Sequence, residues 1–66
     1  MNKKFVKNRL KYLDKSQRDL AKKLDIDPAA VHYLLNGKRQ LKAKEVVPLA
    51  NFLQVYPADI LNNLGA

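Results

Sequence analysis

The amino-acid sequence predicts an all-α fold, a compact bundle of about five short helices in a single domain comprising residues 1–66. The chain is too short for a second domain. Apolar residues recur at the three- and four-residue spacing of amphipathic helices, and residues that favour helix ends separate these runs. The hydrophobic fraction of 47% is sufficient for one small core.

The first helix is expected to begin at residue 2 or 3 and to end near Leu13. Val6, Leu10 and Leu13 fall on one of its faces and are therefore candidates for the core. Its lysines lie on the other faces, where a solvated surface is the simpler interpretation and a contact with distant phosphates is the alternative.

The stretch from Ser16 to Asn36 predicts two short helices joined by a tight turn. Ser16 is a favourable N-cap for a helix that runs from Gln17 to about Leu24. Helical periodicity then breaks at Asp25, a residue type that tolerates a left-handed backbone better than most. We therefore expect the chain to turn sharply at Asp25.

The third helix is expected to start with Asp27 as its N-cap and Pro28 at its first position. Gly37 is suited to end this helix as a C-terminal cap. Its inward face carries three apolar residues, Val31, Leu34 and Leu35. Helices this short, joined by so tight a turn, cross steeply, which is the helix-turn-helix arrangement.

The fourth helix is expected over roughly Lys42 to Gln54, with Pro48 inside it. Because a proline removes one helical hydrogen bond and clashes with the preceding turn, we expect either a kink or a helix that begins closer to Glu45. The inward stripe of this helix consists of Val46, Leu49, Ala50 and Leu53. A last short helix is expected to begin at Pro57 and to bring Ile60 into the core.

The positive charge is confined to one part of the chain. All 13 Lys and Arg lie within residues 1–44 with four acidic residues, so this part has a net charge of +9, whereas residues 45–66 have −2 and the whole chain +7. We favour a polyanionic partner for the first part and a protein partner for the apolar tail. A basic face that only keeps a small domain in solution is the alternative.

The sequence lacks the residues that most enzymes and metal sites need. One histidine and no cysteine exclude a multi-histidine metal site, a disulfide and a thiolate site, and leave a histidine-based triad without support. Two glycines cannot form a phosphate-binding loop. We therefore expect no enzyme activity, catalytic residue, cofactor, metal or small-molecule substrate. The absence of cysteine fits a reducing cytoplasm, and no stretch approaches the length of a membrane span.

Several short motifs occur with the spacing of a known family. They are Ser16-Gln17, Leu20-Ala21, Asp25-Ile26, Val31 with Leu34, Asn36-Gly37-Lys38, and the later run Ala50-Asn51-Phe52-Leu53-Gln54-Val55. With them the chain resembles, over roughly Val6 to Leu61, the DNA-binding domains of the phage-repressor and Cro-like family, the lambda-repressor-like group. The resemblance implies a DNA-binding regulator whose third helix enters the major groove.

The outer arc of the third helix is expected to contact the bases through Ala29, Ala30, His32 and Tyr33. None of these is Arg, Lys, Asn or Gln, the residue types that read guanine and adenine most strongly. The alanines offer only methyl contacts, suited to thymine methyl groups, while the histidine and the tyrosine can hydrogen-bond bases or phosphates. An ordinary surface role is the competing interpretation for His32 and Tyr33.

Phosphate contacts are expected from Gln17, Asn36, Lys38 and Arg39. A side-chain amide beside the free N–H groups and the positive dipole of a helix start suits a phosphate oxygen, which favours Gln17. Lys38 and Arg39 belong to a run of four cations in seven residues after the third helix, where the resemblance implies backbone contact. For Gln17 the alternative is an ordinary surface residue in the first turn of its helix. For Lys38 and Arg39 the alternative is a solvated loop.

We expect the protein to be a phage or prophage-type repressor that binds double-stranded DNA as a homodimer through Leu61 and Leu64 of its last helix. For these leucines the alternative is that they complete the core of the monomer. For the function, the alternative is a protein-interaction module, an antitoxin or adaptor that retains the fold. The weak base-reading arc favours that alternative, and the basic part of the chain disfavours it.

Overall fold

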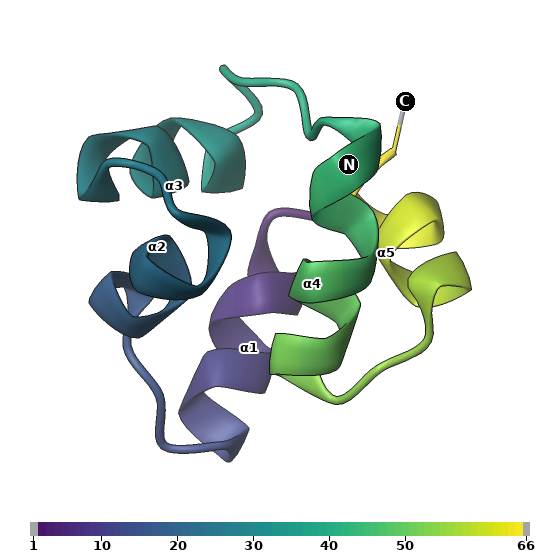
Figure 1. Ribbon diagram of the computed structural model, residues 1–66. Coiled ribbons are helices and arrows are strands. Elements are labelled where there is room, and N and C mark those ends of the chain that lie inside the picture. Colours follow the sequence, from purple (N-terminus) through teal and green to yellow (C-terminus); the bar gives the residue numbers. More distant parts are fainter. Residues whose placement is uncertain (1, 66) are drawn as a thin grey trace.

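The computed structural model describes residues 2–65, which form five α-helices and no strand (Figure 1). In chain order the helices are α1 (Lys4–Tyr12), α2 (Gln17–Leu24), α3 (Pro28–Leu35), α4 (Ala43–Leu53) and α5 (Pro57–Leu64). The predicted all-α bundle is confirmed. Helix α1 is slightly shorter at each end than expected, and the bounds of α2 agree with the expectation.

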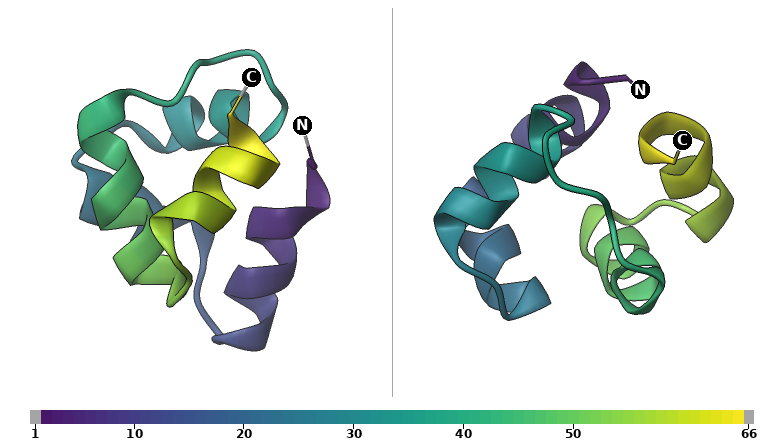
Figure 2. Two further views of the ribbon diagram at one scale, coloured as in Figure 1. Left: turned by 90° about the vertical axis from the view of Figure 1, so that its right-hand side faces the viewer. Right: turned by 90° about the horizontal axis from the view of Figure 1, so that it is seen from above.

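Most of the bundle packs against α4. Helices α1, α2 and α5 contact α4, whereas α3 packs chiefly on α2. Figures 1 and 2 show α3 at one side of the molecule and α5 at the opposite side. Helices α2 and α3 therefore form the expected helix-turn-helix, and α3 is attached to the bundle mainly through α2.

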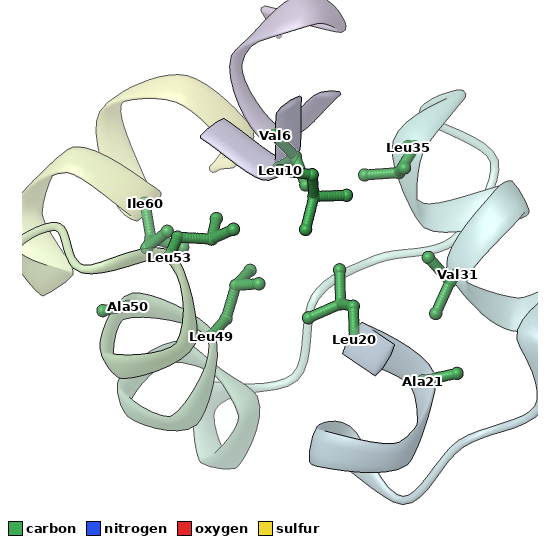
Figure 3. Packing of buried hydrophobic residues seen from close by; sticks show 10 residues of the cluster. All are labelled: Val6, Leu10, Leu20, Ala21, Val31, Leu35, Leu49, Ala50, Leu53 and Ile60. Atoms are coloured by element: carbon green, nitrogen blue, oxygen red, sulfur yellow. The ribbon is translucent and has the colours of Figure 1, made fainter. Parts of the chain in front are cut away.

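One hydrophobic core joins all five helices. Figure 3 shows Leu10, Leu20 and Leu49 converging on it from α1, α2 and α4. Its ten buried members are Val6, Leu10, Leu20, Ala21, Val31, Leu35, Leu49, Ala50, Leu53 and Ile60. Eight of them lie at positions predicted to face inward, and the other two, Leu20 and Ala21, are apolar residues of the predicted second helix. The prediction is wrong for Leu13, which is the half-buried C-cap of α1 and lies outside this cluster. Burying each of the large side chains contributes roughly 1.5–3 kcal/mol, so this cluster provides the main favourable term in folding.

The starts of α2 and α3 are held by the side chains that the sequence predicts. Ser16 Oγ accepts a hydrogen bond from the backbone N–H of Asp19 (3.1 Å), and the Asp19 carboxylate accepts one from the N–H of Ser16 (3.0 Å). Asp27 Oδ1 accepts a hydrogen bond from the N–H of Ala29 (2.8 Å). Both predicted N-caps are confirmed, and Asp19 completes a capping box that was not predicted.

Helix α4 begins at Ala43 and continues through Pro48. The alternative that it begins closer to Glu45 is therefore wrong. The Glu45 carboxylate holds the start of the helix by accepting a hydrogen bond from the N–H of Lys42 (2.9 Å). Pro48 has no N–H to offer the carbonyl of Lys44, so the helix lacks one internal hydrogen bond at this point.

Left-handed residues follow each of the first four helices. They are Asp14 (φ 56°), Asp25 (φ 55°), Gly37 (φ 74°) and Gln54 (φ 57°). The N–H of the next residue then bonds back to the helix, as from Ile26 to the carbonyl of Ala21 (3.0 Å). The predicted turn at Asp25 and the predicted cap at Gly37 are confirmed, whereas Asp14 and Gln54 were not foreseen.

Two basic residues hold the C-terminal end of α4. Arg9 of α1 donates hydrogen bonds from Nε and Nη2 to the carbonyl oxygen of Leu53 (3.1 and 2.9 Å), and its Cζ lies 5.0 Å from the ring centroid of Tyr12. Lys15 Nζ donates a hydrogen bond to the carbonyl oxygen of Phe52 (3.4 Å) and lies 4.4 Å from the centroid of that ring. These contacts satisfy carbonyls that have no partner within the helix and place positive charge at the negative end of its dipole.

Replacing Gln54 with glycine is expected to raise the free energy of unfolding by about 0.5–1 kcal/mol. An L-residue in the left-handed region costs about 1–2 kcal/mol, part of which is offset by the extra entropy that glycine gives the unfolded chain. Urea or thermal unfolding of the parent, Gln54→Gly and Gln54→Ala measures the difference. The alanine variant retains a Cβ and should show no gain, and a glycine variant less stable than the parent would contradict the prediction.

Candidate nucleic-acid interface

The outer face of α3 is the surface predicted to read the bases. Ala29, His32 and Tyr33 are exposed and Ala30 is half-buried, whereas the inward residues Val31, Leu34 and Leu35 are buried. The side chain of Tyr33 keeps half of its surface in solvent. The structure thus brings the four predicted base-contacting residues together on one helix, opposite the face that packs on the bundle.

His32, Tyr33 and Asn36 form a small cluster at the end of α3. The rings of His32 and Tyr33 lie edge to face, with centroids 5.9 Å apart and an interplanar angle of 62°. Asn36 is the C-cap of the helix, and its Nδ2 donates a hydrogen bond to the carbonyl oxygen of His32 (2.7 Å). The same Nδ2 also lies 3.4 Å from each ring nitrogen of His32, so the expected phosphate contact from this amide would compete with contacts inside the protein.

Gln17 is the first residue of α2 and is half-buried. The capping box uses the N–H of Asp19, two residues further on, whereas the first N–H groups of a helix have no partner within it. The side-chain amide of Gln17 thus lies beside unpaired N–H groups at the positive end of the helix dipole. This is the arrangement for which a phosphate contact is expected.

Lys38 is attached directly to the end of α3. The N–H of Gly37 bonds to the carbonyl of Leu34 (3.2 Å), and the N–H of Lys38 bonds to the carbonyl of Tyr33 (2.8 Å). This pair of hydrogen bonds is the Schellman cap that a glycine in the left-handed conformation permits. The cap fixes the backbone of Lys38 beside Tyr33, while its side chain stays exposed and free to reach a phosphate.

Arg39 occupies a different position from its neighbour. Its Nη1 and Nη2 each donate a hydrogen bond to one carboxylate oxygen of Glu45, both at 3.0 Å. The exposed fractions of the two side chains are 19% for Arg39 and 6% for Glu45. The sequence predicts a phosphate contact for Arg39 and does not predict this pair, because no local spacing rule links two residues that lie six apart across a loop.

Glu45 is the one buried charged residue of the described chain, and Arg39 determines its ionisation. The hydrogen bonds from the Arg39 guanidinium lower the pKa of the Glu45 carboxyl, with help from the N–H and the charge of Lys42, and these effects outweigh the desolvation that raises it. The carboxylate is therefore held in its charged form, as a stable ion pair requires.

The basic residues divide into two groups by exposure. The half-buried Arg9, Lys15 and Arg39 all make hydrogen bonds inside the protein. The other ten of the 13 Lys and Arg are exposed. These ten, which include Lys38, are the cations available to a polyanion.

The two leucines expected at a dimer interface differ in exposure. Leu61 on α5 keeps 56% of its surface in solvent. Leu64, one turn further on, is half-buried and packs against the core. The alternative that these leucines complete the monomer core thus applies in part to Leu64, whereas Leu61 stays exposed. Its helix, α5, lies on the opposite side of the molecule from α3 (Figure 1).

Residues 2–65 contain no group of three or more histidine and acidic side chains that could hold a metal ion. Among these residues there is also no helix with the length and the apolar composition needed to cross a membrane.

A comparison with protein families finds a match that covers most of the chain. The helix-turn-helix family model HTH_3 matches residues 6–60, which cover most of α1, all of α2 to α4 and the start of α5. Neither the curated proteins nor the solved structures contain a significant match to the chain.

Replacing Glu45 with glutamine is expected to lower the free energy of unfolding by roughly 1–3 kcal/mol near neutral pH, because the bidentate charged hydrogen bonds are lost. The pKa of Glu45 is lower in the folded state than in the unfolded chain. The stability gained from the charged carboxylate is therefore complete above pH 4.5, the ordinary glutamate pKa, and disappears as the pH falls through the folded-state pKa. The stability difference between parent and variant should therefore shrink on acidification.

Denaturant unfolding of both proteins at a series of pH values measures this difference. Asp14→Asn, at an exposed turn, controls for the loss of one negative charge. A difference that stays constant from neutral to strongly acidic pH would contradict the assignment.

Proposed function

The chain belongs to the helix-turn-helix family HTH_3 and is thereby a DNA-binding helix-turn-helix regulator, and on this premise we propose that it is a repressor of the phage or prophage type. It binds operator DNA with α3 in the major groove and represses by occupancy, excluding polymerase or another regulator. The observation that carries the proposal is the exposed face of α3 with Lys38 capped directly onto its end.

Direct base readout in this proposal is modest. Ala29 and Ala30 contact thymine methyl groups, and His32 and Tyr33 hydrogen-bond base edges or phosphates. Because these side chains make few strong base contacts, the shape and deformability of the operator contribute to the sequence preference. Selection of bound duplexes from a random pool would reveal the operator.

Phosphate contacts hold α3 in the groove. Gln17 lies at the start of α2 beside unpaired N–H groups, and Lys38 follows α3 with an exposed side chain. Asn36 adds a phosphate contact through the amide hydrogen that faces the His32 ring in the free protein. The remaining exposed lysines provide long-range attraction, which suits a protein working in the cytoplasm on chromosomal or phage DNA.

The protein acts as a homodimer on DNA, with Leu61 of α5 at the centre of a symmetric interface and Leu64 at its edge. Two modules on one duplex raise the affinity through effective concentration, which compensates for the few base readers in each. The apolar patch is small, so the free dimer is weak and DNA promotes it. Half-sites about one helical turn apart, near 34 Å, are expected.

Duplex affinity is expected to fall steeply with salt, with a log–log slope of about −0.9 per phosphate contact. Lys38→Ala should weaken binding to every sequence and flatten the slope by about 0.9, since one phosphate contact is lost. Lys11→Ala, in the last turn of α1, is a matched control and should change the slope little. Binding that does not depend on salt, or no binding at low salt, would contradict the DNA-binding proposal and favour a protein-interaction module.

Leu61→Glu is expected to leave the fold intact, because Leu61 is exposed, and to abolish cooperative binding to a duplex with two half-sites. Asn62→Glu, at an exposed neighbouring position, controls for the added charge. Titration of one- and two-half-site duplexes measures the cooperativity, and circular dichroism checks the fold. If Leu61→Glu binds as cooperatively as the parent, α5 is not the dimer interface.

A further inference from the structure

We propose that Arg39 is a positioning residue and not a phosphate contact. With Glu45 it ties the loop that follows α3 to the first turn of α4, and so fixes α3 and Lys38 in the orientation that DNA binding needs. This inference rests on the function proposed above and assigns one residue in it.

Helix α3 has few other attachments to the body of the protein. It packs chiefly on α2, whereas α1, α2 and α5 are the helices that pack against α4. Figures 1 and 2 show its C-terminal end continuing into a loop that crosses to the start of α4 at the edge of the bundle. That loop, residues 36–42, is therefore the second connection between the recognition helix and the core.

The loop is held at three points. The cap formed by Gly37 and Lys38 joins it to α3, and Leu41 packs against the core. Between them, Arg39 bonds through both Nη atoms to the carboxylate of Glu45, in the first turn of α4. A planar guanidinium that bonds a carboxylate through two parallel hydrogen bonds fixes direction as well as distance, which a lysine cannot do.

The carboxylate in this pair is itself held in place. Glu45 Oε1 also accepts a hydrogen bond from the N–H of Lys42 at 2.9 Å, so the acceptor cannot swing outward with the arginine. To reach a phosphate with both Nη atoms, Arg39 would have to leave a carboxylate that is 6% exposed without its charged partner. The exposed side chain of Lys38 can reach a phosphate without breaking a contact inside the protein. The two adjacent cations therefore have different roles.

The test compares the parent with Arg39→Lys, Arg39→Ala, Glu45→Gln and the exchanged pair Arg39→Glu with Glu45→Arg. Affinity and salt slope are measured on the duplex that the parent selects from a random pool, well below each unfolding temperature. Arg39→Lys keeps the positive charge and loses the bidentate geometry. We expect it and Glu45→Gln to weaken binding on the order of tenfold with unchanged salt slopes, and the exchanged pair to recover most of the loss.

Hydrogen exchange of the free proteins gives a second readout. The N–H groups of Gly37 and Lys38 should exchange faster in Arg39→Lys and Glu45→Gln, because the loop behind the cap is no longer tied to α4. This measurement needs no DNA and does not depend on whether the exchanged pair folds. Unchanged protection at both N–H groups would overturn the proposal.

Two binding outcomes would also overturn it. Parent-like affinity for Arg39→Lys, together with a slope flattened by about 0.9 for Arg39→Ala, would identify Arg39 as a direct phosphate contact. Glu45→Gln binding as tightly as the parent would show that the pair is not needed. Failure of the parent to bind any duplex would instead reject the proposed function, which distinguishes the two failures.

Discussion

Burial of α4 is the constraint on which the other parts of the structure depend. Leu49, Ala50 and Leu53 are fully buried, and three of the four other helices pack against this helix. A chain of 66 residues can form only one such core, and helices this short are not stable alone, so each must contribute to it. Helix α3 does so with Val31 and Leu35 and otherwise stays at the side of the bundle. The packing that stabilises the domain thus leaves free the outer face of α3, the face that is proposed to bind DNA.

Short helices also explain how the polar residues are used. With eight to eleven residues each, the helices have nearly as many unpaired N–H and C=O groups at their ends as paired groups inside. Ser16 and Asp27 satisfy N-terminal groups, and Arg9 satisfies carbonyls at the end of α4. A basic residue used in this way is not available to a nucleic acid. The formal charge of the first 44 residues therefore overstates the charge that DNA meets, and exposure is the better guide.

The end of α3 shows how one cap organises the candidate interface. Gly37 adopts a conformation that other residues enter only at a cost, and this directs Lys38 outward beside Tyr33. The next residue, Arg39, turns back to the buried carboxylate of Glu45. Two adjacent cations thus occupy opposite environments, one in solvent and one in the protein, within a single loop.

The sequence by itself determined the local interactions of the structure, those between residues close together in the chain. The caps at Ser16 and Asp27, the turn at Asp25 and the glycine at 37 each involve residues a few positions apart, so their chemistry can be read directly from the chain. The spacing of apolar residues likewise predicted most members of the core cluster, although Leu13, at the end of α1, does not join it. For the same reason the exposed arc of α3 and the position of Lys38 were predictable.

Contacts between distant or non-helically spaced residues were decided only by the tertiary structure. Arg9 meets Leu53 across 44 positions and Lys15 meets Phe52 across 37, and no periodicity relates them. The partner of Arg39 likewise depends on how the loop approaches α4, and the different exposures of Leu61 and Leu64 depend on how α5 lies on the core. Sequence specifies which side chains can pair or pack. The relative placement of the helices decides which of them do, because a hydrogen bond or a buried contact requires the two groups to be within a few ångströms in space.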